Sequence, residues 1–322
     1  MTKAGPLLDV NDLTVEIATR HGALRVLDQV SLSLERSEVL GVVGESGAGK
    51  SMLGNAIAGL LEPPASVTGG EVALSGRRID SLSRDAARRV LGREIGMVFQ
   101  DPLTSLDPLF SIGDQLEETI RVHLSVGPRE ARDTAVKLLE ETGLPAARSR
   151  LDDYPHQFSG GMRQRVVLAL ALCANPQLVI ADEPTTALDV SIQAQIIRLL
   201  QRMCLDHGTA VILITHDMGV IADASERVAV MYAGRIVEIG PTSDVISRPR
   251  HPYTQGLMGA IPPLKRQPRR LEQINGNMPR ADKLLGGCSF HPRCPLVFEK
   301  CRHESPVLEG GEGHAKACWL DG

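Results

Sequence analysis

Apolar and polar residues alternate at the start of the chain and then give way to a continuous apolar run. Residues 7–17 and 30–34 each alternate as an edge-type strand does, and His21-Gly22 between them predicts a turn. Residues 39–43 are apolar or glycine throughout, which is typical of a buried strand. The sequence therefore predicts edge-type strands first and then a strand in the buried core.

Strands and helices alternate over the next two hundred or so residues. Short strands are predicted at residues 72–74, 95–99, 178–181 and 211–214 and near Val228 and Ile236. Helices are predicted from the P-loop described below to about residue 61, at residues 83–92, 112–123 and 129–142, from residue 161, and at residues 191–206. This alternation predicts an α/β fold with a largely parallel sheet. The stretch from about residue 103 to 165 is helical and is interpreted as an inserted helical subdomain.

The alternation of predicted strands and helices ends at about residue 248. Prolines recur through the tail, so long regular elements are not expected there. Four of the six cysteines fall in its last part. We therefore divide the chain into a first domain at 1–247 and a small module at 248–322.

Composition narrows the class of protein. The chain of 322 residues is 43% hydrophobic but only 3% aromatic, which suits a parallel-sheet core of aliphatic residues. A formal net charge of −4 argues against a broad basic surface for nucleic acid. The start of the chain lacks signal-peptide order, and the apolar run 166–174 is too short to span a bilayer. We expect a cytosolic protein whose cysteines are not in disulfides.

One segment carries the strongest chemical signal, the pattern G-x-x-x-x-G-K-S between a predicted strand and a predicted helix. It comprises Gly44, Glu45, Ser46, Gly47, Ala48, Gly49, Lys50 and Ser51. Glycines let backbone N–H groups approach phosphates, and the helix N-terminus adds partial positive charge. Lys50 is expected to reach the β- and γ-phosphates of ATP, and the Ser51 hydroxyl to ligate Mg²⁺.

Candidate catalytic residues follow the ends of three other predicted strands. Asp182 would organise Mg²⁺ through its water shell, and Glu183 would polarise the attacking water as a general base. The amide of Gln100 can bind both metal and water. His216 could contact the γ-phosphate, or it could simply occupy a surface turn.

Ser159-Gly160-Gly161 offers a hydroxyl and free N–H groups at the start of an apolar helix. This is a second possible anion site, and an ordinary serine N-cap is the alternative. Since the chain already has a phosphate loop, the second site is interpreted as serving another chain's nucleotide in a head-to-tail pair.

The order of these motifs resembles that of the nucleotide-binding subunit of ABC transporters. Gly44–Ser51 matches Walker A, Gln100 the Q-loop, residues 158–162 the signature, residues 178–183 Walker B, Ala187-Leu188-Asp189 the D-loop, and His216 the switch histidine. The resemblance implies a RecA-like parallel core with an antiparallel β subdomain and a helical subdomain. It also places His21 near the position of the aromatic residue that stacks on adenine in many members.

Further segments resemble the oligopeptide/dipeptide importer ATPases. They are residues 100–108, FSGGMRQR at 158–165, His251-Pro252-Tyr253-Thr254 and residues 288–295. The signature with Phe and Met is similar to the D-type subunit, which pairs with a second, F-type ATPase. The resemblance implies two permease subunits, an extracytoplasmic solute-binding protein, and a peripheral site on the cytoplasmic face of a bacterial inner membrane. Peptide is the expected cargo, with nickel or another small solute as the alternative.

Cys288, Cys294, Cys301 and Cys318 match the number of ligands for a 4Fe-4S cluster or a structural zinc. The tight cysteine pair usual for zinc is absent, but His291, His303 and His314 could also serve as ligands. Spacing therefore leaves both metals open, and the resembled family favours the 4Fe-4S cluster. Cys173 and Cys204 are expected in the apolar core.

The sequence disfavours two other classes of function. A soluble ABC-type ATPase acting on nucleic acid or ribosomes usually has two cassettes, a long coiled coil or a basic surface, and the sequence has none of these. A metal-binding scaffold with a vestigial ATP site is disfavoured because every catalytic residue type is present.

Overall fold

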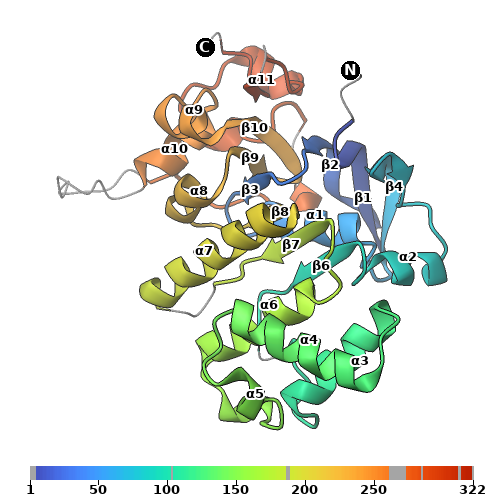
Figure 1. The fold of residues 1–322 in the computed structure, drawn as a ribbon. Coiled ribbons are helices and arrows are strands. Elements are labelled where there is room, and N and C mark those ends of the chain that lie inside the picture. Colours follow the sequence, from blue (N-terminus) through green and yellow to red (C-terminus); the bar gives the residue numbers. More distant parts are fainter. Residues whose placement is uncertain are drawn as a thin grey trace. The chain divides into compact units, whose positions relative to one another are not determined.

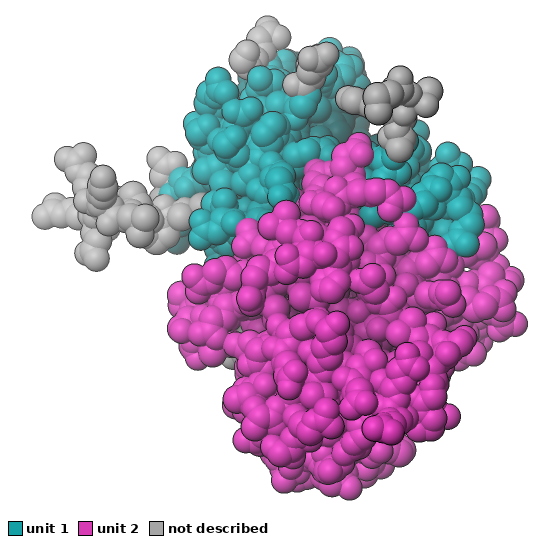
Figure 2. All heavy atoms as spheres, viewed as in Figure 1, with its two compact units in different colours: residues 1–34, 40–80, 215–322 teal, residues 35–39, 81–214 magenta. Residues whose placement is uncertain are grey.

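The computed structural model describes residues 5–102, 104–185, 189–260, 273–283, 286–310 and 313–320. It divides into two compact units, coloured separately in Figure 2. Unit 1 comprises residues 1–34, 40–80 and 215–322, and unit 2 comprises residues 35–39 and 81–214. Each unit is therefore assembled from segments that are not contiguous in the sequence.

An antiparallel sheet in unit 1 contains the first strands of the chain (Figure 1). Its strands are β1 (Leu8–Thr19), β2 (Gly22–Leu34), β4 (Ala65–Leu74) and β5 (Arg77–Arg78), in the order β2-β1-β4-β5. Leu8, Val10, Leu13 and Val15 of β1 are fully buried, and a register shift between Val10 and Leu13 interrupts the alternation. The predicted antiparallel subdomain and its hairpin turn are confirmed.

Unit 1 also contains the strand that leads into the P-loop. β3 (Val39–Val43) pairs in parallel with β9 (Arg227–Tyr232), which pairs antiparallel with β10 (Arg235–Pro241) and through it with β11 (Ala315–Lys316). Helices α1 (Lys50–Ala58) and α8 (Met218–Ala224) belong to the same unit. Helix α1 ends earlier than predicted because Gly59, at φ 69°, stops it before the Pro63-Pro64 pair is reached.

Unit 2 combines three parallel strands with most of the helices. β6 (Ile95–Val98), β7 (Leu178–Asp182) and β8 (Ala210–Ile214) lie in the order β8-β7-β6 and are almost wholly buried. The helices are α2 (Arg84–Val90), α3 (Ile112–His123), α4 (Pro128–Glu141), α5 (Ala147–Arg150), α6 (Gly160–Leu172) and α7 (Val190–His207), with a 3₁₀ turn at Pro155–Gln157. Parallel strands and helices follow the predicted α/β pattern.

The helices α3 and α4 of unit 2 lie where the sequence predicted helices, at residues 112–123 and 129–142. Ser111 starts α3 through a capping box with Asp114, and Pro128 occupies the first turn of α4. Helices α3, α4, α5 and α6 gather into one group of green ribbons in Figure 1. Apolar residues of α3 and α4, including Ile112, Leu116 and Leu139, are fully buried.

In the described part of the tail, from residue 248 on, the elements are all short, as predicted. They are α10 (Pro252–Gly259), α11 (Glu299–His303), β11, and 3₁₀ turns at Ala281–Lys283 and His291–Arg293, and the short helix α9 (Thr242–Ser247) comes just before them. Its core contains the rings of Tyr232, Tyr253 and Phe290, whose centroids lie 4.7 to 5.4 Å apart. Among the described residues, no helix has both the length and the apolar composition needed to cross a membrane.

Candidate functional site

The P-loop connects the carboxyl end of β3 to the first turn of α1. Gly44, Gly47 and Gly49 all have positive φ, at 155°, 85° and 102°. A Cβ at Gly44 would overlap the carbonyl oxygen of Met231 in β9. The loop can therefore follow this path only with glycine at Gly44, and glycine is strongly favoured at the other two positions.

Lys50 is buried at the start of α1, with only 7% of its surface exposed. Its Nζ donates to the carbonyl oxygens of Gly44 at 2.8 Å and Glu45 at 3.1 Å. Gly49 is the N-cap residue of α1, but as a glycine it provides no side-chain hydrogen bond to the helix N–H groups. Ser51 is exposed in the first turn. The loop thus brings an ammonium group and an uncapped helix N-terminus together, an arrangement suited to a phosphate.

His216 belongs to the same unit as this loop. The neighbouring Thr215 donates its N–H to the carbonyl of Val42 in β3 at 3.1 Å. Val42 lies two residues before Gly44, so the exposed His216 emerges beside the strand that carries the P-loop. Unit 1 therefore holds two of the predicted phosphate-contacting elements.

In unit 2, Gln100 and Glu183 meet beyond the carboxyl ends of neighbouring strands β6 and β7. The Gln100 Nε2 donates to Glu183 Oε2 at 3.1 Å. Asp182, the last residue of β7, is 7% exposed, whereas Glu183 is half-buried. Sequence reasoning found these residues separately but missed their contact. The available signal was that both follow strands of one parallel sheet.

Glu183 has an unusual backbone conformation for a non-glycine residue, with φ at 45°. Its N–H donates to the carbonyl of Ile214 in β8 at 2.8 Å, which holds the chain in this turn. Non-glycine residues adopt this region at a cost of about 1–2 kcal/mol. The strain falls on the residue predicted to be the general base, where such strain often occurs.

The start of α6 carries the predicted second anion site, also in unit 2. The Ser159 Oγ accepts the N–H of Met162 at 3.4 Å, so the serine is an N-cap, and Gly160 is the first helical residue. A Cβ at Gly161 would come within 2.9 Å of the Ile192 side chain. The Ser159 cap and the close packing of Gly161 against Ile192 therefore both help to set the conformation of this turn.

Asp189 and His21 have local roles in the structure. Asp189 caps α7 by accepting the N–H of Ile192 at 2.9 Å. His21 is exposed in the β1–β2 turn, and its N–H donates to Thr19 Oγ1 at 3.2 Å. The other two residues of the predicted D-loop, Ala187 and Leu188, lie outside the described residues.

The four tail cysteines are all free thiols, and the structure does not bring them together as a set of metal ligands. Burial, with smaller contributions from Cys301, Cys318 and Cys294, raises the pKa of Cys288 to about 11. Burial also raises the pKa of Cys294, with contributions from Cys318 and Cys301. Across the described ranges, no group of three or more His, Cys, Asp or Glu side chains is arranged to hold a metal. The thiols thus influence one another without being preassembled.

The three histidines considered as alternative ligands are hydrogen-bonded to other groups. His291 Nδ1 lies 2.9 Å from the Cys288 carbonyl oxygen. His303 Nε2 lies 2.8 Å from Glu299 Oε1, and His314 Nε2 lies 2.7 Å from Glu238 Oε1. These partners do not favour the histidines as ligands in place of the cysteines.

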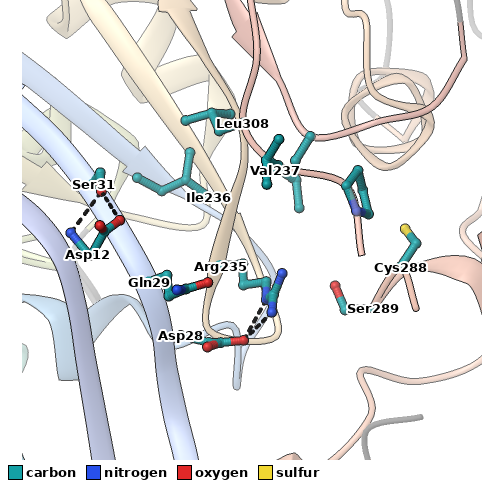
Figure 3. Close-up of a pocket in the computed structure, with 13 residues that line it drawn as sticks. Asp12, Asp28, Gln29, Ser31, Arg235, Ile236, Val237, Cys288, Ser289 and Leu308 are labelled. Carbon is teal, nitrogen blue, oxygen red and sulfur yellow. Dashed lines mark hydrogen bonds and ion pairs between the residues drawn. The ribbon is translucent and has the colours of Figure 1, made fainter. Parts of the chain in front are cut away.

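A pocket of about 350 Å³ lies in unit 1, with Cys288 and Ser289 across from Asp12 and Ser31 (Figure 3). Its charged side chains are already paired, because Arg235 binds Asp28 and the Asp12 carboxylate accepts the Ser31 hydroxyl. The pocket therefore presents one of the tail thiols beside satisfied polar groups.

Sequence reasoning missed two tail residues that contact the P-loop. Arg293 forms an ion pair with Glu45, and the Tyr253 hydroxyl accepts the Glu45 N–H. Both residues belong to tail segments that resemble the oligopeptide/dipeptide importer ATPases. No periodicity or spacing in the sequence connects those segments to Glu45.

Comparisons with protein families agree with this arrangement of elements. The ABC transporter family matches residues 27–186, and the oligopeptide/dipeptide transporter C-terminal region matches residues 237–301. The two matches cover the P-loop, the signature and most of the tail, in the order in which they occur along the chain.

Curated relatives match along nearly the whole chain. A probable peptide ABC transporter ATP-binding protein of Sinorhizobium fredii is 47% identical over 98% of this chain and 96% of its own. The oligopeptide transport ATP-binding protein OppD of Salmonella typhimurium is 44% identical over 98% and 94%. The dipeptide transport ATP-binding protein DppD of Escherichia coli is 43% identical over 94% and 92%.

Solved structures share the fold. A dimeric ATP-binding cassette in a post-hydrolysis state with ADP and Pi superposes with a TM-score of 0.66 at 28% identity, covering 73% of this chain and 98% of that one. The cbiO1 protein of Clostridium perfringens, part of the cbiONQ ABC transporter complex, gives 0.65 at 28% identity, with 76% and 91% covered. The chain belongs to the ABC transporter family as an ATP-hydrolysing, ATP-binding subunit, in the branch that carries the oligopeptide/dipeptide transporter C-terminal region.

Proposed function

We propose that this chain hydrolyses ATP to energise the import of di- or oligopeptides. The observation that carries the proposal is the near-complete match, at 43% to 47% identity, to proteins named for peptide, oligopeptide and dipeptide transport. The match to the C-terminal region of such transporters supports the same cargo. The competing hypothesis is an importer ATPase for nickel or another solute, and measuring uptake of both peptide and nickel distinguishes the two.

Phosphate binding is assigned to the P-loop. Lys50 contacts the β- and γ-phosphates, while the glycines present backbone N–H groups to the same oxygens. Support comes from the buried ammonium group at the uncapped start of α1. Ser51, Gln100 and Asp182 would hold Mg²⁺, which neutralises phosphate charge when it is bound.

Water activation is assigned to Glu183. Its carboxylate accepts a proton from the attacking water, and the amide of Gln100, bonded to it at 3.1 Å, orients that carboxylate. His216 would contact the γ-phosphate and respond to its loss. His21 would stack on the adenine.

The Ser159-Gly160-Gly161 turn and Asp189 are assigned to a partner ATPase. In a head-to-tail pair this turn would complete the γ-phosphate site of the other subunit. ATP would then favour the closed pair and hydrolysis would release it, because only ATP contacts both halves. We infer a heterodimer with a second ATPase, on two permease subunits served by an extracytoplasmic solute-binding protein, at the cytoplasmic face of a bacterial inner membrane.

The domain division also stays a proposal. We place the nucleotide-binding domain at 1–247, its helical subdomain at about 103–165, and the C-terminal module at 248–322. Limited proteolysis that released a stable fragment ending near residue 247 would support this boundary.

The test of function is uptake by cells that lack this gene. Labelled dipeptide, pentapeptide and nickel are supplied, and wild type, Glu183→Gln or Glu62→Gln is added back. Glu62 is exposed and outside the proposed site, so it provides a matched loss of one carboxylate. Recovery of peptide uptake by wild type and Glu62→Gln, but not Glu183→Gln, is expected. Recovery of nickel uptake alone would overturn the peptide assignment.

We propose a 4Fe-4S cluster for Cys288, Cys294, Cys301 and Cys318, with Zn²⁺ as the alternative metal. The pKa values of Cys288 and Cys294 are raised in part by other tail cysteines, which supports the grouping, and the thiols must lose their protons to bind iron. Full-length protein purified without oxygen should contain about four irons per chain. Zinc without iron would replace the cluster hypothesis, and the absence of both metals would remove it.

A further inference from the structure

The tail of the chain contacts the P-loop through Glu45, the second residue of the P-loop motif. Arg293 Nη1 and Nη2 donate to Glu45 Oε2 and Oε1 at 2.9 and 3.1 Å, a two-point ion pair. The Glu45 N–H donates to the Tyr253 hydroxyl at 2.9 Å. Both the side chain and the backbone of one P-loop residue are therefore held by the tail.

Arg293 is fixed by more than this ion pair. Its guanidinium also donates to the carbonyl oxygens of Asn275 at 2.9 Å and Gly276 at 3.2 Å, and it lies 5.8 Å from the centre of the Tyr232 ring. Only 7% of the side chain is exposed, against 27% for Glu45. The geometry is that of a preset cation rather than a flexible surface arginine.

Tyr253 is equally constrained. It is fully buried, and its ring packs against Tyr232 and Phe290. It lies in the first turn of α10, whose cap His251 accepts the Tyr253 N–H at 3.0 Å. Its hydroxyl therefore occupies a fixed position from which it accepts the Glu45 N–H.

Electrostatics give these contacts a consequence for ATP. Glu45 places a carboxylate in a loop built for a polyanion, and an unpaired carboxylate there would repel the phosphates. The bidentate Arg293 neutralises that charge and holds both carboxylate oxygens of Glu45 on its guanidinium. The Tyr253 contact meanwhile fixes the backbone turn that precedes Lys50.

We propose that Arg293 and Tyr253 are positioning residues for ATP binding, with Arg293 acting by neutralising Glu45. The proposal rests on the assignment of residues 44–51 to the phosphates. It gives the two tail segments His251-Pro252-Tyr253 and His291-Pro292-Arg293 one shared purpose, which is to support the phosphate loop.

A double-mutant cycle on the full-length protein tests this proposal. The Kd for ATP and the ATPase KM and kcat are measured for wild type, Arg293→Met, Glu45→Gln and the double variant. Arg293→Met should raise the Kd about tenfold when Glu45 is present and about twofold when residue 45 is glutamine. The effect should appear mainly in KM, since Arg293 does not contact the reacting atoms.

Controls separate charge compensation from folding. Arg302→Met removes an exposed arginine from the same module and should leave the Kd unchanged. Arg293→Lys restores the charge without the two-point geometry and should recover part of the affinity. If Arg293→Met does not fold, the cycle is completed with Arg293→Lys, and Tyr253→Phe tests the backbone contact.

The outcomes distinguish this proposal from the proposed function. An equal effect of Arg293→Met in both Glu45 backgrounds, or no effect, overturns charge compensation. A wild-type protein that binds no ATP would instead contradict the assignment of the P-loop itself.

Discussion

Two turns beside the candidate ATP residues adopt the left-handed backbone region, and they use different residues to do so. The P-loop places glycine at its positive-φ positions Gly44, Gly47 and Gly49. The turn after β7 places Glu183 at φ 45° instead. Glycine adopts this region without steric cost, whereas glutamate has to be held there by its surroundings.

The difference follows from what each turn offers to a ligand. The P-loop offers backbone N–H groups, so a side chain at Gly44 would only obstruct it. The turn after β7 offers a carboxylate, so glycine there would remove the chemistry. The strain at Glu183 is offset by its hydrogen bonds to Ile214 and Gln100. The P-loop thus contributes a backbone shape, and the turn after β7 contributes a reactive side chain.

The largest predicted effect breaks the reactive turn while leaving its shape intact. Glu183→Gln should lower kcat by about 10²–10⁴, because the amide cannot accept the water proton. The Kd for ATP should change little, since the backbone and the Gln100 contact can persist. Phosphate release and equilibrium ATP binding measure the two quantities. Near-normal turnover would contradict the general-base assignment.

The next prediction compares two glycines within the P-loop. Gly44→Ala should lower the free energy of unfolding by about 3 kcal/mol, because its Cβ would overlap the Met231 carbonyl. Gly47→Ala should cost only about 1 kcal/mol, since the nearest atom, in Met278, lies 3.8 Å from the added Cβ. Denaturant unfolding measures both variants. Equal losses would mean that φ alone, rather than close packing, determines the need for glycine.

A smaller effect than that of Gly44→Ala is predicted at His251, which caps the helix that carries Tyr253. Burial, aided by Lys316, lowers the pKa of His251 to about 4, from an ordinary value near 6.5. The unfolded chain therefore binds this proton more readily, and stability falls as the pH drops from about 6.5 towards 4. Between pH 7 and pH 5 this one group should cost about 2 kcal/mol.

His251→Asn isolates that contribution. Asparagine can still accept the Tyr253 N–H as a helix cap but does not titrate. The pH dependence of its unfolding free energy should be shallower than that of wild type by the same amount. Identical slopes would show that His251 is not responsible, whatever the absolute stability of the variant.

Much of the fold could be predicted from local pattern. The hairpin at the start of the chain, the helix at residues 112–123 and the buried strands all follow apolar periodicity and turn residues. The helix after the P-loop ends at Ala58, before the predicted end near residue 61, because Gly59 stops it ahead of the prolines. Apolar periodicity and turn residues are local signals, so they could not show how discontinuous segments combine into two units.

The sequence by itself determined the P-loop, because its glycines, lysine and serine are contiguous and their order carries the chemistry. It also indicated Asp182, Glu183 and Gln100, since each follows a recognisable strand. Only the tertiary structure showed that Gln100 bonds to Glu183, 83 positions away, and that Arg293 pairs with Glu45, 248 positions away. Such contacts depend on which buried surfaces pack together, and no spacing along the chain encodes them.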